Sequence, residues 1–297
     1  KVKQYIADAR QLGYKSIGKF LKLDRASLPK PPLGMIHLSD EYLSDKKGYA
    51  LYPFVDFVLK NYWSDSIASG EYIASLPEAD REKAKRQKVY YFPLGYANGY
   101  GPIPAETLLP ASRRKYGVAF SGQVRLKNNF RPFLGELKPR LAKEGFPAKI
   151  DFSNGWAKGM VFDDYRHLMT HSAIGKTLFA THTHTHTHTH THTHTALVPG
   201  GQNVETFRFS EAFEAGAVPI VEKVMGRAAM YEGTGLDFPA PMIETWQSPK
   251  TLELILRLLS NHTLLNEVQA KCITWWQRHK HMQARRLRDA ILTEYPP

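Results

Sequence analysis

The sequence contains a single cysteine, Cys272, so no disulfide can form within the chain. It also contains no apolar run near the roughly 20 residues that a membrane-spanning helix requires. No signal peptide is visible, and the first residue is Lys rather than Met. We therefore expect an N-terminally trimmed piece of a longer protein, from which a membrane anchor could have been lost.

Acidic residues are in the minority: 28 Asp and Glu stand against 40 Lys and Arg, which gives a net charge of +12. Such a balance favours anionic partners, among them nucleic acids, anionic glycans, phosphorylated acceptors and nucleotide diphosphates. Nucleic-acid binding would also require aromatic side chains on a basic face. The aromatic residues here lie within apolar runs instead, so we expect no nucleic-acid partner. With 297 residues and 42% hydrophobic content, the chain can form one large domain or two medium ones.

The stretch from Thr195 to Glu222 has the pattern strand, glycine loop, helix, strand. Phe209 and Phe213 are four residues apart, which places them on one face of a helix. Two parallel strands need such a crossover, so the pattern predicts a βαβ unit. Its parts are the apolar run Ala196–Pro199, the pair Gly200 and Gly201, the helix Val204–Ala215, a C-terminal cap at Gly216 and the apolar run Ala217–Val221.

A glycine loop before a helix leaves free backbone N–H groups at the positive end of the helix dipole, an arrangement that suits a phosphate. Thr206, Arg208 and Glu211 lie near that end. An Arg can bind a diphosphate with two hydrogen bonds, and a Glu can accept both hydroxyls of a ribose. An ordinary βαβ unit with an exposed Arg and Glu remains the alternative on composition alone.

The residue identities in this stretch are more specific than its order of strand, loop, helix and strand. Pro-x-Gly followed by Glu-Thr-Phe-Arg-x-x-Glu-Ala-x-x-Ala-Gly-x-Val-Pro-Ile-Val closely resembles the signature of the exostosin-like glycosyltransferases, glycosyltransferase family 47. The segments HLSDE (37–41), VLKNYW (58–63) and FPLGY (92–96) resemble the same family, nearest to its ribitol xylosyltransferase subgroup. This chain departs from the family at Val198 and Ala217, where Cys is frequent, and at Glu205, where Asp is frequent.

The resemblance implies an α/β protein of the GT-B fold, with two Rossmann-like domains that face a cleft. We expect a partial acceptor-side domain over residues 1–105, a nucleotide-sugar domain over 106–250, and C-terminal helices over 251–297 that pack back across the cleft. The implied activity is transfer of a sugar from a UDP-sugar to a glycan or phosphorylated glycan, with inversion and without a metal or cofactor. The implied location is the Golgi or secretory-pathway lumen, with the full-length protein a type II membrane protein.

The resemblance also assigns roles on the donor side. Arg125, which follows the turn at Ser121 and Gly122, is expected to contact the donor diphosphate, with Arg131 as a second candidate, because fixed Arg groups stabilise a leaving diphosphate. Glu205 and Arg208 are expected to contact the sugar or the phosphates. Surface arginines on a basic protein are the alternative interpretation.

An inverting reaction needs a base that takes the proton of the acceptor hydroxyl. Asp40 and Glu41 follow the predicted strand Leu33–Leu38, and ligand sites in α/β folds lie just past the carboxyl ends of strands. They are our candidates, with His37 in reserve. The alternative is that Asp40 or its neighbour Ser39 only caps the following helix.

Thr181–Thr195 alternates Thr with seven His residues, and residues 174–195 interrupt the family pattern as an insertion. In an extended chain all His would lie on one face, where neighbours could bind Zn, Ni or Cu. No Cys or carboxylate is interleaved, so we favour a low-complexity surface loop. Because this insertion lies beside the donor loop, a catalytically inactive glycan- or nucleotide-binding partner subunit is a second functional hypothesis.

Overall fold

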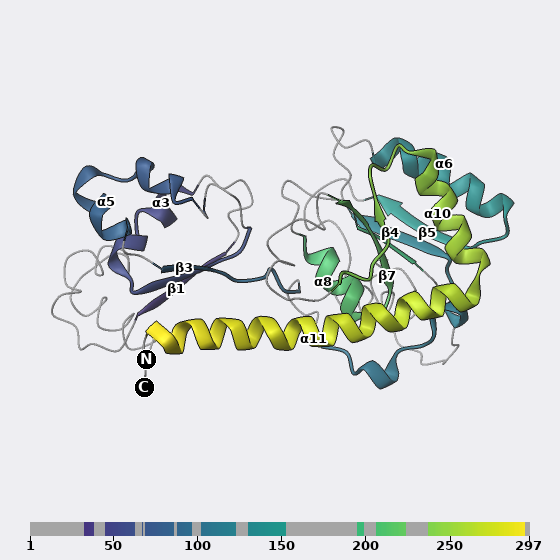
Figure 1. The fold of residues 1–297 in the computed structure, drawn as a ribbon. Coiled ribbons are helices and arrows are strands. Elements are labelled where there is room, and N and C mark those ends of the chain that lie inside the picture. The colour runs from purple at the N-terminus through teal and green to yellow at the C-terminus, as the bar shows by residue number, and fades with distance from the viewer. Residues whose placement is uncertain are drawn as a thin grey trace, which may run out of the picture. The chain divides into compact units, whose positions relative to one another are not determined.

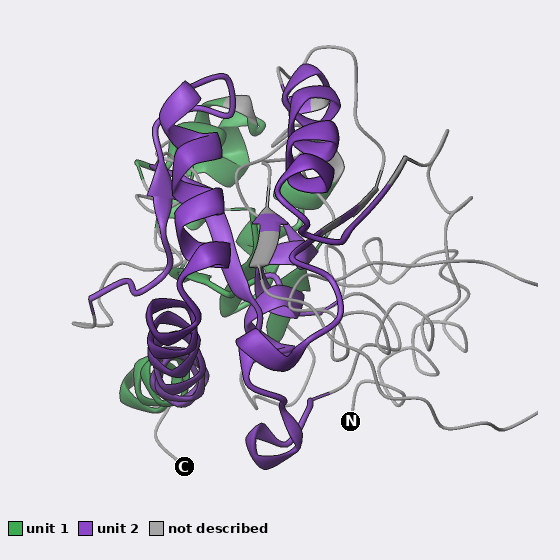
Figure 2. Cartoon of the chain, turned by 90° about the vertical axis from the view of Figure 1, so that its right-hand side faces the viewer, with its two compact units in different colours: residues 1–93, 285–297 green, residues 94–284 purple. Residues whose placement is uncertain are grey.

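The computed structural model describes residues 33–38, 45–62, 67, 69–85, 88–96, 102–122, 130–152, 195–198, 206–223 and 237–294. The chain is a mixed α/β protein with two parallel sheets, of three and five strands. It divides into two compact units, residues 1–93 with 285–297 and residues 94–284 (Figure 2). The helix α11 (His262–Glu294) contributes residues to both units.

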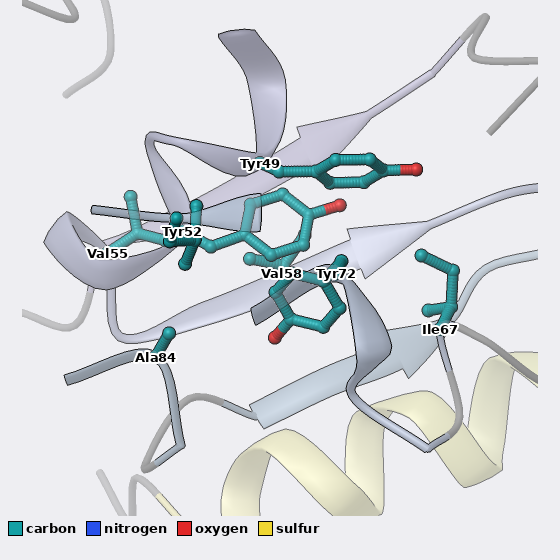
Figure 3. Close-up of a cluster of buried hydrophobic side chains, with 8 residues drawn as sticks. Tyr49, Tyr52, Val55, Val58, Ile67, Tyr72 and Ala84 are labelled. Atoms are coloured by element: carbon teal, nitrogen blue, oxygen red, sulfur yellow. The ribbon is translucent and has the colours of Figure 1, made fainter. Parts of the chain in front are cut away.

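The first unit is built on the strands β1 (Gly34–His37), β2 (Phe57–Lys60) and β3 (Lys88–Tyr91), which are parallel and adjacent in chain order. The short helix α3 (Lys46–Tyr49) and the helix α5 (Glu78–Lys85) lie on the crossovers (Figure 1). The core consists of buried side chains from these elements and from the segments that connect them: Tyr49, Tyr52, Val55, Val58, Ile67, Tyr72, Leu76 and Ala84 (Figure 3).

The second unit contains a five-stranded parallel sheet in the order β5-β4-β6-β7-β8. The strands are β4 (Val118–Gly122), β5 (Ala148–Phe152), β6 (Thr195–Val198), β7 (Val218–Glu222) and β8 (Met242–Ile243). Val218, Ile220 and Val221 of β7 are fully buried. A strand covered on both faces reads as a continuous apolar run, which is how β7 reads in the sequence.

Helices cover both faces of this sheet. α6 (Phe130–Lys143) and α10 (Pro249–Ser260) lie on one side, and α8 (Phe207–Glu214) with the neighbouring part of α11 lies on the other (Figure 1). Right-handed crossovers produce this arrangement when the chain turns from one side of its first strand to the other. Five rings form an aromatic cluster between α8 and α11, namely Phe209, Phe213, Phe238, Trp275 and Trp276.

The predicted βαβ unit is confirmed: β6 and β7 are parallel neighbours, and α8 connects them. Gly216 ends α8 with a φ of 61°, the left-handed conformation expected of a C-terminal cap. Asn261 caps α11, since its Oδ1 accepts a hydrogen bond from the Leu264 N–H at 3.0 Å.

Two kinds of feature are absent from the described residues. None of the described helices combines the length and the apolarity required to cross a membrane. Within the same ranges, no group of three His, Cys, Asp or Glu side chains is arranged as a metal site. The His residues of the Thr-His tract lie outside the described residues.

Candidate functional site

The strand order of the second unit contains one point at which the chain reverses direction across the sheet. From β4 the chain crosses to β5 on one side, and it then returns to β6 on the other side of β4. In doubly wound sheets of this order, ligands bind outside the carboxyl ends of the two strands at the reversal. That edge is formed here by the end of β4, Ser121 and Gly122, by the end of β6 at Val198 and by the start of α8.

The N-terminus of α8 lies at this edge, and the first backbone N–H groups of a helix have no partner within the helix itself. Thr206 is the N-cap residue, but its side chain makes no capping hydrogen bond. It is 8% exposed, and its Oγ1 has no hydrogen-bond partner among the described residues. A buried hydroxyl without a partner is costly, about 1–3 kcal/mol. The helix N-terminus therefore has both backbone donors and a hydroxyl available for an anionic ligand.

Arg208 brings a positive charge to the same place. It lies on the first turn of α8, and its guanidinium carbon is 5.7 Å from the centre of the Phe120 ring. Phe120 is on β4, directly before Ser121, so the contact joins the helix to the strand on the other side of the reversal. A cation held over an aromatic face keeps a defined position.

The structure thus brings several predicted donor-site residues to one edge. Ser121 and Gly122 end β4, Thr206 and Arg208 begin α8, and Arg131 is the second residue of α6, the helix that follows β4. Glu211 lies one turn after Arg208 and is 2% exposed; its predicted ribose contact stays a prediction. The remaining predicted residues lie outside the described residues: Asp40, Glu41, Arg125, Gly200, Gly201 and Glu205.

A buried carboxylate that the sequence did not single out fixes the other end of α8. Glu214 is 1% exposed and accepts four hydrogen bonds. Its Oε2 receives the Tyr96 hydroxyl at 2.5 Å, the Trp276 indole N–H at 2.5 Å and the Lys280 ammonium at 2.7 Å. Its Oε1 receives the Ile103 N–H at 2.8 Å.

Burial raises the pKa of Glu214, but the hydrogen bonds from Lys280, Tyr96 and Ile103 outweigh it and leave the pKa below its ordinary value. Burial and the adjacent carboxylate raise the pKa of Tyr96, which therefore stays protonated as the donor. The Glu214 carboxylate is thus a charged hydrogen-bond acceptor surrounded by donors in fixed positions. It ties α8 to α11 and to the segment 94–103.

Hydrogen bonds from other elements also fix the C-terminus of α8. Arg114, which is 2% exposed, donates to the carbonyl oxygens of Leu109 at 2.8 Å and Ala215 at 3.1 Å. Gln269 of α11 donates to the Gly216 carbonyl oxygen at 2.8 Å. These side chains satisfy the carbonyl groups that a helix end leaves without partners. The anchored end of α8 fixes the position of its N-terminus at the sheet edge.

A second polar cluster occupies the carboxyl edge of the three-stranded sheet in the first unit. His37 ends β1 and is paired in register with Lys60, which ends β2. The His37 Nδ1 lies 2.7 Å from the Tyr52 hydroxyl, and its Nε2 lies 3.2 Å from Asp45 Oδ2. Asn61, directly after β2, is fully buried and neither of its side-chain amide atoms has a hydrogen-bond partner in the described structure.

Comparison with known proteins does not identify a family for this chain. No family model matches the chain, and no curated protein matches it. Among solved structures, the crystal structure of a GtfA/B complex matches with a TM-score of 0.46 at 12% identity. The match covers 93% of this chain and 55% of the other, so the chain spans little more than half the length of that structure's chain. At this level of similarity it assigns no family or activity.

Proposed function

We propose that the protein is a glycosyltransferase of the GT-B architecture. It transfers a sugar from a nucleotide sugar, a UDP-sugar, to a hydroxyl of a glycan or phosphorylated glycan, with inversion at the anomeric carbon and without a metal. The exostosin-like family and a secretory-pathway location belong to this proposal. They rest on the sequence resemblance alone.

The observation that supports it best is the N-terminus of α8 at the reversal of the five-stranded sheet. The first-turn backbone N–H groups of α8, the hydroxyl of Thr206 and the cation of Arg208 lie there. Such a set of donors matches the oxygens of a diphosphate, because each oxygen can accept from a fixed group.

These groups would also promote the reaction. The diphosphate gains negative charge as the bond to the sugar breaks, and donors already fixed in place stabilise that charge without rearrangement. Arg125 and Arg131 are proposed to add positive charge at the same edge. Glu211 is proposed to hold the ribose, and Gly200, Gly201 and Glu205 to line the loop before α8.

The acceptor hydroxyl must lose a proton as it attacks the sugar. We propose that a carboxylate beyond the end of β1 takes that proton, and Asp40 and Glu41 are the candidates named from the sequence. His37 is a poor direct base, since it is 4% exposed and its two ring nitrogens face Tyr52 and Asp45.

Calorimetry with UDP and a panel of UDP-sugars tests the proposal. We expect micromolar binding to the intact chain, equal in EDTA and in Mn²⁺, and at least tenfold weaker for Arg208→Ala. Arg257→Ala, an exposed arginine at the end of α10, is the matched control and should bind normally. Absence of nucleotide binding by folded protein would reject the proposal. Binding without turnover on a broad acceptor panel would favour the inactive partner subunit.

A further inference from the structure

Asn261, His262 and Thr263 form the one triplet in the sequence that reads Asn, any residue except proline, then Ser or Thr. This triplet is the acceptor sequence for N-linked glycosylation. Three residues are a short signal, so the site must be judged by where the structure places them.

The triplet lies at the junction of two helices in the second unit. Asn261 is the C-cap residue of α10, and His262 is the first residue of α11. The side chains of all three residues are exposed. Leu259 and Leu265, on either side of the triplet, are fully buried. The junction is therefore held against the core while the triplet faces solvent, as a bulky and strongly hydrated glycan requires.

Asn261 also caps α11, and the cap and the glycan use different atoms of its side chain. Oδ1 accepts the hydrogen bond from the Leu264 N–H at 3.0 Å. A glycan is attached to the side-chain nitrogen, Nδ2. Within the part of the chain that the structure describes, Nδ2 makes no hydrogen bond to another residue. The two roles are therefore compatible.

The cap does not explain Thr263. This residue lies in the first turn of α11, and its exposed hydroxyl makes no hydrogen bond to any other described residue. Threonine is β-branched and has a lower helix propensity than most unbranched residues, so the helix alone does not favour it there. The acceptor triplet does require a hydroxyl residue at this position.

The triplet lies at the edge of the five-stranded sheet opposite to the proposed nucleotide site. Leu259, near the end of α10, would lie 3.3 Å from a Cβ placed on Gly117, the residue directly before β4. The proposed nucleotide site is at the other end of β4, whose five residues span about 16 Å. A glycan on Asn261 therefore leaves that site open.

We propose that Asn261 carries an N-linked glycan. This inference rests on the secretory-pathway location that belongs to the proposed function. The donor is an oligosaccharide on a lipid diphosphate, delivered by an oligosaccharide-transferring enzyme of that pathway. A bond forms between Nδ2 and C1 of the first sugar while the bond from that carbon to the diphosphate oxygen breaks. The electron pair leaves with the lipid diphosphate, Nδ2 gives up one proton, and the amide oxygen remains as the cap.

The test is expression of the full chain behind a cleavable signal peptide in a eukaryotic secretory host, followed by digestion with a peptide N-glycosidase. The wild type should migrate as one glycosylated species that digestion converts to the mobility of the unmodified chain. Mass spectrometry should locate the change at Asn261, because the enzyme leaves aspartate where it removes a glycan. The modification is read on all translocated protein, so a variant that folds poorly still reports.

Substitutions within the triplet separate the acceptor from the cap. Thr263→Ala keeps the capping side chain and should abolish the modification. Asn261→Asp also keeps a good cap residue and should abolish it. Thr263→Ser keeps the hydroxyl and should remain modified. Thr274→Ala changes another exposed threonine of α11 and is the matched control, which should be modified as the wild type is.

The outcomes separate this inference from the proposed function. Translocated wild type that binds UDP but carries no glycan on Asn261 overturns this inference and leaves the transferase proposal intact. Modification that persists in both Thr263→Ala and Asn261→Asp overturns it as well. Glycosylated wild type that binds no nucleotide overturns the transferase proposal alone. The Kd for UDP should be equal before and after digestion, because the two sites lie at opposite edges of the sheet.

Discussion

The indole N–H of Trp276 on α11 donates to the Glu214 carboxylate on α8 at 2.5 Å, across 62 residues of sequence. The two side chains are 6% and 1% exposed, so the bond forms inside the core of the second unit. Lys280, one turn further along α11, donates to the same oxygen at 2.7 Å. The position of α8 relative to α11 therefore depends on one buried charge.

Removal of the Glu214 carboxylate should strongly destabilise the protein. Glu214→Ala leaves a lysine, an indole N–H and a backbone N–H without their acceptor, and a broken buried pair costs about 3–5 kcal/mol. Urea unfolding of the variant should show that loss. Glu253→Ala, on the exposed face of α10, should change the free energy of unfolding by less than about 0.5 kcal/mol. Equal stability of the two variants would contradict the assigned role of Glu214.

His279 should make the protein sensitive to mild acid. It is 3% exposed and stacks on Trp275 at 4.5 Å, and burial lowers its pKa from 6.5 to about 4. Between pH 6.5 and about pH 4, His279 binds a proton in the unfolded chain but not in the folded one. The free energy of unfolding is therefore highest above pH 6.5 and falls until about pH 4. The loss amounts to about 3 kcal/mol, since one pKa unit corresponds to about 1.4 kcal/mol.

Urea midpoints of wild type and His279→Gln, measured from pH 7 to pH 4, check this prediction. The wild type should lose stability over that interval relative to the variant. The lowered pKa of Glu214 adds a separate loss at lower pH, where its carboxylate is protonated. Parallel curves for the two proteins between pH 6.5 and pH 4 would show that His279 does not cause the effect.

Gly216 and Gly145 form a matched pair of left-handed glycines. Gly216 has a φ of 61°, and a Cβ there would lie 2.6 Å from Leu108 Cδ1 and 3.1 Å from Arg114 Nη2. Gly145 has a φ of 77° with nothing within 4 Å. Gly145→Ala should cost about 1–2 kcal/mol from the backbone alone, and Gly216→Ala should cost at least about 1 kcal/mol more. Thermal unfolding of both variants measures the difference, and equal costs would rule out the crowding.

Much of the fold could be predicted where the pattern is local. The glycine at position 216 depends on neighbours within a few residues, and the structure confirms it as the C-terminal cap of α8. The βαβ unit of β6, α8 and β7 follows from the continuous stretch Thr195–Glu222, and the structure confirms it too.

The support beneath the candidate site could not be predicted in the same way. The hydrogen-bond donors to Glu214 lie 62, 66, 111 and 118 residues away in the sequence, so no local spacing of residues predicts them. The local sequence indicates only that Glu214 lies among the apolar residues Phe213, Ala215 and Ala217, and that α8 has no basic residue other than Arg208. The contact of His37 with Asp45 forms between the end of β1 and the start of α3, and the sequence alone did not indicate it.

Thr206→Val should separate ligand binding from stability. The substitution removes a buried hydroxyl that has no partner in the described structure, so the free energy of unfolding should stay constant or rise. Binding of UDP should weaken at least tenfold, because a hydrogen bond to a charged group contributes about 1.5–3 kcal/mol. Thr274→Val, on the exposed face of α11, should change neither quantity. Unchanged UDP affinity in Thr206→Val would show that the Thr206 hydroxyl does not bind the nucleotide.

Hydrogen–deuterium exchange of the intact chain with and without UDP tests the central claim most directly. We expect protection in peptides that contain the end of β4 and the first turn of α8, residues 118–122 and 206–210, and no change in peptides from β1, β2 and β3. Protection confined to the first unit, or none at saturating UDP, would contradict a nucleotide site at the reversal of the five-stranded sheet.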